Sequence, residues 1–195
     1  MSKVLTTPKG TAVYPHIQAP DYKFSSDGVY NCKINVSEDD FNAFSKIVVD
    51  IVEREYEAEC RLKGKKLKRA TSLPVKITED GDFQIYAKQV AKRQTKKGLL
   101  EFVVPVFDSK GNRIKDVPNI GSGSTLRLSV EVYTWYTDLH GFGYTLRLKA
   151  AQIIELIEYS GGSNFGFDSE EDGYVNDGES LDTAFEEEAP QGIGF

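Results

Sequence analysis

Two aromatic side chains, Tyr133 and Trp135, stand two residues apart in the run TLRLSVEVYTWY, which spans residues 125–136. Apolar and polar residues alternate along this run, which is typical of a β-strand with one buried and one outward face. The alternation places both rings on the polar face, opposite the expected core residues Leu126, Leu128, Val130 and Val132. Exposed rings at this spacing could stack on unpaired nucleobases, and each stack contributes about 1–3 kcal/mol whatever the base. The pattern equally allows both rings to pack beneath a loop, and the residues alone leave these two interpretations open.

Basic residues accompany the rings. In the next alternating run, YTLRLKAAQIIELIE (144–158), Arg147 and Lys149 fall on the polar face, and Arg127 does so in the first run. The connections RLKGKKLKRA (61–70) and KRQTKK (92–97) are also rich in Lys and Arg. A single lysine is most often a solvated surface charge, but two basic loops beside exposed rings predict a groove that follows a phosphate backbone.

The residues that catalysis or metal binding requires are missing from the pattern. His16 and His140 are the two histidines of the chain, and neither has a Cys, His or acidic residue at ligand spacing. No nucleophile stands with a recognisable base. Cys32 and Cys60 match no metal or redox spacing and are predicted to be reduced, packed thiols. We therefore expect a binding protein that is not an enzyme and needs no metal and no cofactor.

The elements that must position these residues are mostly strands. GVYNCKINV (28–36) predicts a strand, and Ser37 with Asp40 resembles a capping box that starts a helix. That helix has an apolar face made of Phe41, Phe44, Ile47, Val48, Ile51 and Val52. Residues 83–90 and 99–107 are expected to form a strand pair, DSKGN (108–112) a turn, and the two long alternating runs a closing hairpin. Five strands with one helix after the first favour an all-β fold, a five-stranded OB-fold barrel with one capping helix, which is a fold that often holds oligonucleotides.

Charge divides the chain into two parts. Residues 160–195 contain ten acidic and no basic side chains, so residues 1–159 hold all 24 basic residues and 20 acidic ones. The net charge is therefore +4 on the body and −10 on the tail. We predict a folded domain over residues 1–159 and a disordered acidic tail over 160–195, because the tail is too polar to bury a core. The N-terminal residues lack the apolar stretch of a signal peptide and no window has the about 18 apolar residues of a membrane span, so we expect a cytosolic protein.

Six parts of the chain carry a resemblance to known proteins: GTAVYPHIQAPDY, GVYNCKINV, KGKKLK, VFDSKGNRIKDVPNIGSGSTLRLSVEVYTWY, TLRLKAAQIIELIEYSGG and an acidic tail that ends in Phe195. They are similar to parts of the replicative single-stranded-DNA-binding proteins of short-tailed phages. The resemblance spans nearly the whole chain in order. It implies an OB-fold barrel, a homodimer, sequence-indifferent binding of single strands and promotion of strand annealing. It also implies a role in DNA replication, recombination and repair in the cytoplasm of an infected bacterium, and a tail that contacts the phage polymerase and the primase-helicase.

The resemblance assigns residues as well. It places the aromatic pair of the DNA face on Tyr133 and Trp135 and the basic loop on Lys63, Lys65 and Lys66. Over the loosely matching region from Glu79 to Lys97, the implied contacts are Lys88, Lys92 and Arg93, and a further basic contact falls on Lys3. In the tail, the implied partner-binding residues are Glu186, Glu187, Glu188 and Phe195, although here six residues separate the last acid from the terminal ring.

The prediction is thus a protein that binds single-stranded DNA and whose acidic tail occupies the basic groove when DNA is absent. Two other functions use similar residues. An RNA-binding OB-fold module would have the same rings and charges, and competition between matched DNA and RNA oligomers separates it from the first. An acidic-tailed chaperone of basic proteins would act through its tail, and its body would ignore nucleic acid.

Overall fold

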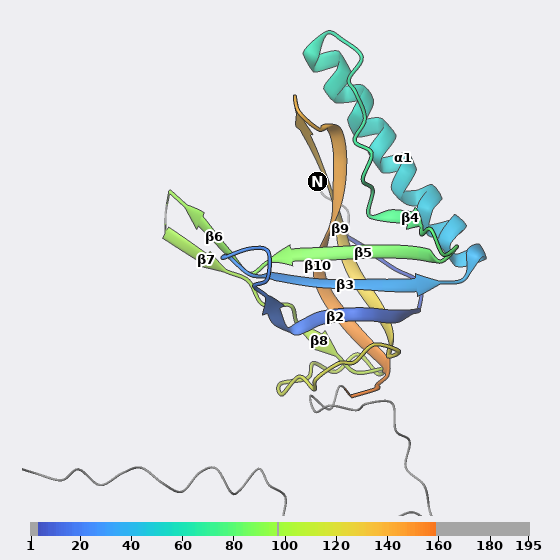
Figure 1. The fold of residues 1–195 in the computed structure, drawn as a ribbon, viewed down its shortest axis with the longest axis vertical. Coiled ribbons are helices and arrows are strands. Elements are labelled where there is room, and N and C mark those ends of the chain that lie inside the picture. The colour runs from blue at the N-terminus through green and yellow to red at the C-terminus, as the bar shows by residue number, and fades with distance from the viewer. Residues whose placement is uncertain (1–3, 97, 159–195) are drawn as a thin grey trace, which may run out of the picture. The chain divides into compact units, whose positions relative to one another are not determined.

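A computed structural model describes residues 4–96 and 98–158 of the chain. They belong to one unit, Met1–Gly161, and the second unit, Gly162–Phe195, lies outside them. Over these ranges the protein is mostly β-structure with one helix, as expected (Figure 1). The elements in chain order are β1 (Val4–Thr6), β2 (Gly10–Asp21), β3 (Val29–Val36), α1 (Glu38–Lys63), β4 (Val75–Ile77), β5 (Phe83–Val90), β6 (Lys92–Thr95), β7 (Gly98–Glu101), β8 (Val106–Phe107), β9 (Thr125–Thr137) and β10 (Gly141–Glu155).

Eight of the strands form one sheet in the order β1-β9-β2-β3-β5-β10-β8, with β4 on β5. β9 and β10 also pair with each other as a long antiparallel hairpin, which places Trp135 opposite Gly143 and Tyr133 opposite Thr145. β5 and β10 run parallel, with Arg147 beside Lys88, and β3 pairs antiparallel with β5, with Lys33 beside Tyr86. These three pairings place residues far apart in the sequence on one continuous face.

The predicted alternation in the hairpin is confirmed. Leu126, Leu128 and Val130 of β9 are fully buried, and Leu146 and Leu148 of β10 are at most 1% exposed. Buried side chains of β3 and β5 meet them in the same core, namely Tyr30, Cys32, Ile34, Ile85 and Ala87. Cys32 and Cys60 are free thiols, as predicted, and burial raises the pKa of Cys32 to about 12.

Helix α1 begins as its sequence predicts. The Ser37 hydroxyl accepts from the Asp40 amide at 3.3 Å, and Glu38, Asp39 and Asp40 place negative charge at the positive end of the helix dipole. Gly64 ends the helix with φ +66°, a left-handed conformation that suits glycine. The buried face consists of Phe41, Phe44, Val48, Val52 and Tyr56.

The two ends of α1 pack on different strands of the sheet. Near its start the Phe41 ring contacts Phe83 of β5, and near its end Tyr56 contacts Phe142 of β10, both with ring centroids 5.3 Å apart. Figure 1 shows the helix running alongside the β9–β10 hairpin as a result. In the part of the chain that the structure describes, no helix has the length and hydropathy to cross a membrane.

Four expectations are corrected by the structure. Residues 83–90 and 99–107 do not pair; instead Lys92–Thr95 pairs with Gly98–Glu101 as a small separate sheet, while β5 pairs with β3, β4 and β10. Ile47 is 46% exposed, because it lies at the edge of the buried stripe of α1. The predicted basic loop 61–70 is helical through Lys63. The count of five substantial strands missed β2, in which Pro15 and Pro20 interrupt the alternation.

Residues 67–70, the second half of the predicted basic loop, are held against the rest of the protein by packing and hydrogen bonds. Leu67 is buried, and its carbonyl accepts from the Tyr56 hydroxyl at 2.8 Å. Arg69 makes two 2.6 Å hydrogen bonds to the Glu53 carboxylate and lies over the Tyr56 ring. The Lys68 carbonyl accepts from the Phe142 amide, and the Phe142 carbonyl from the Ala70 amide. The segment that follows α1 is therefore fixed against the start of β10.

Candidate nucleic-acid interface

The outward side chains of β3, β5, β10 and β9 form one surface, which we call the outer face. It carries three rings, four cations, one carboxylate and one hydroxyl: Tyr86, Tyr133, Trp135, Lys33, Lys88, Arg147, Lys149, Glu131 and Thr145. The register explains the grouping, because Lys33 stands beside Tyr86, Lys88 beside Arg147, and Thr145 beside Tyr133. The two rings predicted from β9 thus lie among basic residues of neighbouring strands.

Tyr133 is 43% exposed, so it is not sealed beneath a loop. The Arg147 guanidinium lies over its ring, with Cζ 3.4 Å from the centroid. Such a cation–π contact holds the guanidinium near the ring while leaving its N–H donors able to meet an anion. Because Arg147 covers one face of Tyr133, the opposite face is the one that a base could use.

Trp135 is held at both ends of its indole. Its Nε1–H donates to the Thr145 hydroxyl at 3.2 Å. Its six-membered ring lies over Gly143, where a Cβ would come within 2.6 Å of Cζ2 and 2.7 Å of Cη2. No left-handed backbone accounts for this glycine, so its value at this position is the space that it leaves for the ring. The indole is therefore partly buried, and these two contacts hold it against β10.

The charges of the outer face differ in how far they are compensated. Lys149 lies 3.6 Å from the Glu131 carboxylate, which neutralises part of its charge. Lys33 lies 6.0 Å from the centre of the Tyr86 ring. Lys88 is exposed on the outward side of β5. The four cations outnumber the Glu131 carboxylate and the Asp21 carboxylate near Tyr86, which makes the face suited to a polyanion.

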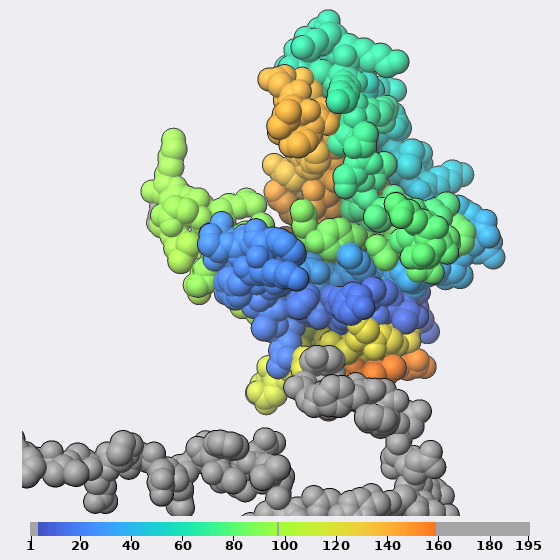
Figure 2. Space-filling view, viewed as in Figure 1, coloured from blue at the N-terminus to red at the C-terminus, as the bar shows by residue number. Residues whose placement is uncertain are grey.

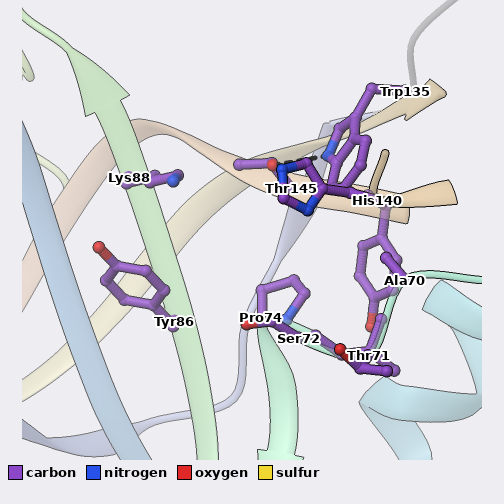
Figure 3. Close-up of a pocket in the computed structure, with 11 residues that line it drawn as sticks. Ala70, Thr71, Ser72, Pro74, Tyr86, Lys88, Trp135, His140 and Thr145 are labelled. Atoms are coloured by element: carbon purple, nitrogen blue, oxygen red, sulfur yellow. Dashed lines mark hydrogen bonds between the residues drawn. The ribbon is translucent and has the colours of Figure 1, made fainter. Parts of the chain in front are cut away.

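A cavity of about 230 Å³ opens beside Trp135 (Figure 3). Tyr86 and Lys88 stand on one side of it, and Trp135 and His140 on the other. Burial raises the pKa of Tyr86, with the nearby Asp21 adding to the shift, and burial raises the pKa of Tyr144 to about 12. Both phenols in the cavity wall are therefore neutral near pH 7, so they add no negative charge where an anion would approach.

The structure brings together five of the predicted contacts: Lys88, Tyr133, Trp135, Arg147 and Lys149. Lys63 lies at the end of α1, with its ammonium 5.3 Å from the centre of the Tyr136 ring at the hairpin tip. Lys65 and Lys66 are exposed just beyond it. This cluster flanks the outer face at the Trp135 end.

Other predicted contacts lie further away. Arg127 is opposite Gln152, six residues along β9 from Tyr133 and so about 20 Å from it. Lys92 and Arg93 lie on β6, in an arm that stands apart from the main sheet (Figure 2), and Lys92 pairs with Glu101 at 3.5 Å. Lys3, Glu186, Glu187, Glu188 and Phe195 fall outside the described residues.

Four further residues of the outer face and the cavity were not predicted from the sequence. They are Lys33, Tyr86, Thr145 and His140. The alternation in KINV and QIYAKQV does show that Lys33 and Tyr86 point outward. It cannot show that β5 lies beside β10, because that pairing joins residues about 60 positions apart. The register of the sheet, and not the local pattern, reveals them.

Comparison with known proteins decides the family. A family model described as single-stranded DNA-binding protein, bacteriophage T7, matches residues 9–156. The chain belongs to this family. Within the T7 single-stranded DNA-binding family, the protein of Escherichia phage T7 is 30% identical over 204 residues, which cover 90% of this chain and 86% of that relative. The protein of Enterobacteria phage T3 is 29% identical over 214 residues, covering 95% of this chain and 90% of the relative.

Solved structures of phage single-stranded DNA-binding proteins are similar to this structure. The crystal structure of a single-stranded DNA-binding protein encoded by bacteriophage T7 has a TM-score of 0.72 at 27% identity, covering 90% of this chain and all of that one. The single-stranded DNA-binding protein of bacteriophage Enc34, solved in complex with single-stranded DNA, has a TM-score of 0.58 at 14% identity and covers 80% of this chain and 88% of that one. At that identity the likeness concerns the fold. The family and these relatives are all described as binding proteins, in agreement with the expectation that the chain is not an enzyme.

Proposed function

We propose that this protein binds single-stranded DNA without regard to sequence and serves phage DNA replication and recombination. The outer face carries the proposal: three rings and four cations meet on one continuous sheet surface, in a chain that belongs to a family described as single-stranded DNA-binding. Unpaired bases would stack on Tyr133 and beside Trp135, while Lys88, Arg147 and Lys33 would meet phosphates.

The physical basis of such binding is general. Every base has a π-face, so stacking on an aromatic ring tolerates any sequence, whereas duplex DNA keeps its bases stacked on each other. Contacts between cations and phosphates release counterions and add affinity that salt weakens. Lys63, Lys65 and Lys66 would extend the cationic surface past the hairpin tip, and Arg127 would lie along a longer path of the strand, with Lys3 as a further proposed contact.

We also propose that the main sheet is an OB-fold barrel. Support comes from the pairings, which lead from β9 through β2, β3 and β5 to β10 and then back to β9. On this proposal the folded domain comprises residues 1–159 and binds DNA, and residues 160–195 form an acidic tail. The protein would act as a homodimer in the cytoplasm of the infected bacterium and promote strand annealing. Through Glu186, Glu187, Glu188 and Phe195, its tail would contact the phage polymerase and primase-helicase.

The test is the affinity for a fluorescently labelled oligo-dT, measured by anisotropy at low salt. Tyr133→Ala and Trp135→Ala should each weaken binding by about 5- to 150-fold, the range that corresponds to one lost base stack. Tyr14→Ala is the matched control, because Tyr14 is a tyrosine 74% exposed on β2, a strand that contributes no side chain to the outer face as defined above, and its amide donates to the Ser122 hydroxyl. This control should bind like the wild type.

Two results would contradict the proposal. One is a failure of the wild-type protein to bind oligo-dT, and the other is equal affinity for all four proteins. A parallel competition with oligo-U of the same length separates DNA from RNA as the ligand. Tighter binding of RNA would replace DNA as the physiological strand while leaving the outer face as the site.

A further inference from the structure

The cavity beside Trp135 is more than a gap at the edge of the outer face. Four of its lining residues belong to the outer face itself: Tyr86, Lys88, Trp135 and Thr145. The remaining wall comes from the segment after α1, from Ala70 to Pro74, and from His140 and Tyr144. A strand that crossed the outer face would therefore pass the mouth of this cavity.

The wall on the far side is fixed in place. The Ala70 amide and the Lys68 carbonyl hydrogen-bond to Phe142 at the start of β10, at 2.8 and 2.7 Å. The Tyr86 amide donates to the Pro74 carbonyl at 2.7 Å, which ties the other end of the same segment to β5. The cavity is therefore formed before any ligand arrives, which reduces the entropy lost on binding.

The chemistry of the lining suits a planar, polar ring. Tyr86 stands on one side of the cavity, and Trp135 with His140 stands on the other (Figure 3). Thr71 and Ser72 add hydroxyl groups, and Lys88 stands at the edge. Among the residues that the structure describes, the side chains of Thr71, Ser72 and His140 make no hydrogen bond to the protein, so their donors and acceptors can serve a ligand.

The volume of the cavity limits the size of the ligand that it can hold. About 230 Å³ is less than the roughly 300–1,000 Å³ of sites for drug-sized ligands, and it matches one small ring system. On a surface that binds a single strand, the planar groups with polar edges are the bases. When a single strand is bound as proposed, its bases stay close to the cavity, because cations hold the phosphates on either side.

We propose that this cavity is a base pocket, which takes one unpaired nucleobase of the strand bound on the outer face. The inference rests on the proposed function and adds to it a distinct subsite. The base enters between Tyr86 and Trp135, its edge meets Ser72 and His140, and Lys88 meets the adjacent phosphate. Tyr133 remains the open stacking platform on the neighbouring part of the sheet.

The pocket can be blocked without altering the outer face. Ser72 is exposed on the segment after α1, so Ser72→Phe would fill the cavity while leaving the strands intact. Ser109→Phe is the matched control, since Ser109 is an exposed serine of the turn between β8 and β9 and does not line the pocket. Circular dichroism and the melting temperature would establish that both variants are folded.

Two probes of equal length are titrated, oligo-dT and an oligomer in which every site is abasic. The pocket predicts that Ser72→Phe weakens oligo-dT binding at least five-fold but changes the affinity for the abasic oligomer less than two-fold. Ser109→Phe should match the wild type with both probes. As an independent readout, Ser72→Phe should also reduce the quenching of Trp135 emission at saturating oligo-dT.

The outcomes separate this proposal from the one on which it rests. If the wild type fails to bind oligo-dT, the proposed function is wrong and the pocket has no ligand. If the wild type binds and Tyr133→Ala weakens binding, but Ser72→Phe binds oligo-dT like the control, the base pocket is overturned and the function stands. Equal losses with oligo-dT and the abasic oligomer would also overturn it, because the pocket would then hold backbone and not a base.

Discussion

Replacing Gly143 by alanine should displace Trp135 and weaken DNA binding. A Cβ at residue 143 would lie 2.6 Å from Cζ2 and 2.7 Å from Cη2 of the indole, closer than real Cβ atoms approach any atom. It would also lie 2.9 Å from the Ala70 Cβ, whose segment is held by hydrogen bonds to Phe142. The indole is the part that can move, and moving it breaks the 3.2 Å hydrogen bond from Nε1 to Thr145.

The size of the effect follows from what the ring loses. A displaced indole forfeits its base stack, which is about 1–3 kcal/mol, or about 5- to 150-fold in Kd. Crowding in the folded state adds a separate cost of about 1–3 kcal/mol in the free energy of unfolding. For a domain of this size, each kcal/mol of that cost lowers the melting temperature by about 2–4 °C. Binding measured well below the melting temperature is therefore free of the stability effect.

The assay is oligo-dT anisotropy combined with the emission spectrum of Trp135, the one tryptophan of the chain. Gly143→Ala should lower the affinity at least five-fold and shift the emission to longer wavelength, because the displaced indole meets more water. A double-mutant cycle with Trp135→Ala is the control, and in that background Gly143→Ala should change the affinity less than two-fold. An unchanged emission spectrum with wild-type affinity would refute the reasoning, and so would the same loss with and without the ring.

Three further predictions concern the outer face and the segment behind it. Lys88→Gln should lower the slope of log affinity against log salt by about 0.7 if Lys88 meets one phosphate, whereas Lys46→Gln, on the exposed side of α1, should leave it unchanged. Tyr56→Phe removes the buried 2.8 Å hydrogen bond to the Leu67 carbonyl and should lower the free energy of unfolding by about 1 kcal/mol, measured by urea denaturation; an unchanged midpoint would be inconsistent with that bond. The hydrogen bonds from Arg69 lower the pKa of Glu53, so their contribution to stability is present above the ordinary carboxyl pKa of about 4.3 and is lost as the pH falls through the lowered value. Glu53→Gln should therefore lower the melting temperature at about pH 7 but hardly at about pH 2, and equal shifts at both would exclude this linkage.

The hairpin that carries the site could be predicted from sequence because its pattern has one interpretation. Eight residues of strict alternation in β9, 125–132, leave no helical alternative, and the polar face that they define continues to Tyr133 and Trp135. The start of α1 was equally clear, since Ser37 and the acids after it act within one turn. In both cases the information is local, within a few residues of the feature that it predicts.

The parts that could not be predicted depend on pairings between distant residues. The β6–β7 hairpin forms from the polar residues around 92–101, where no apolar alternation announces a strand. β2 is interrupted by Pro15 and by Tyr14 at φ +46°, so its pairing with β3 slips between Val13 and His16. The role of Gly143 exists only because the register places it opposite Trp135.

The same limit applies to the composition of the site. The basic run at 61–70 predicted a cationic loop, yet Arg69 is engaged by Glu53 and the helix includes Arg61 and Lys63. Two further residues of the outer face, Lys33 and Tyr86, were not predicted, because the sequence does not show which strands lie beside β3 and β5. The composition indicated an anionic ligand with aromatic groups, but the residues that lie together on the outer face become known only from the register of the sheet.

The account depends most directly on Trp135 lying at the bound strand. Since the chain has a single tryptophan, its fluorescence reports on that site alone. In a titration of the full-length protein with labelled oligo-dT, quenching of Trp135 and the anisotropy of the oligonucleotide should rise together and give the same Kd. Tight binding by anisotropy with Trp135 emission unchanged throughout would place the DNA elsewhere on the protein and contradict the account.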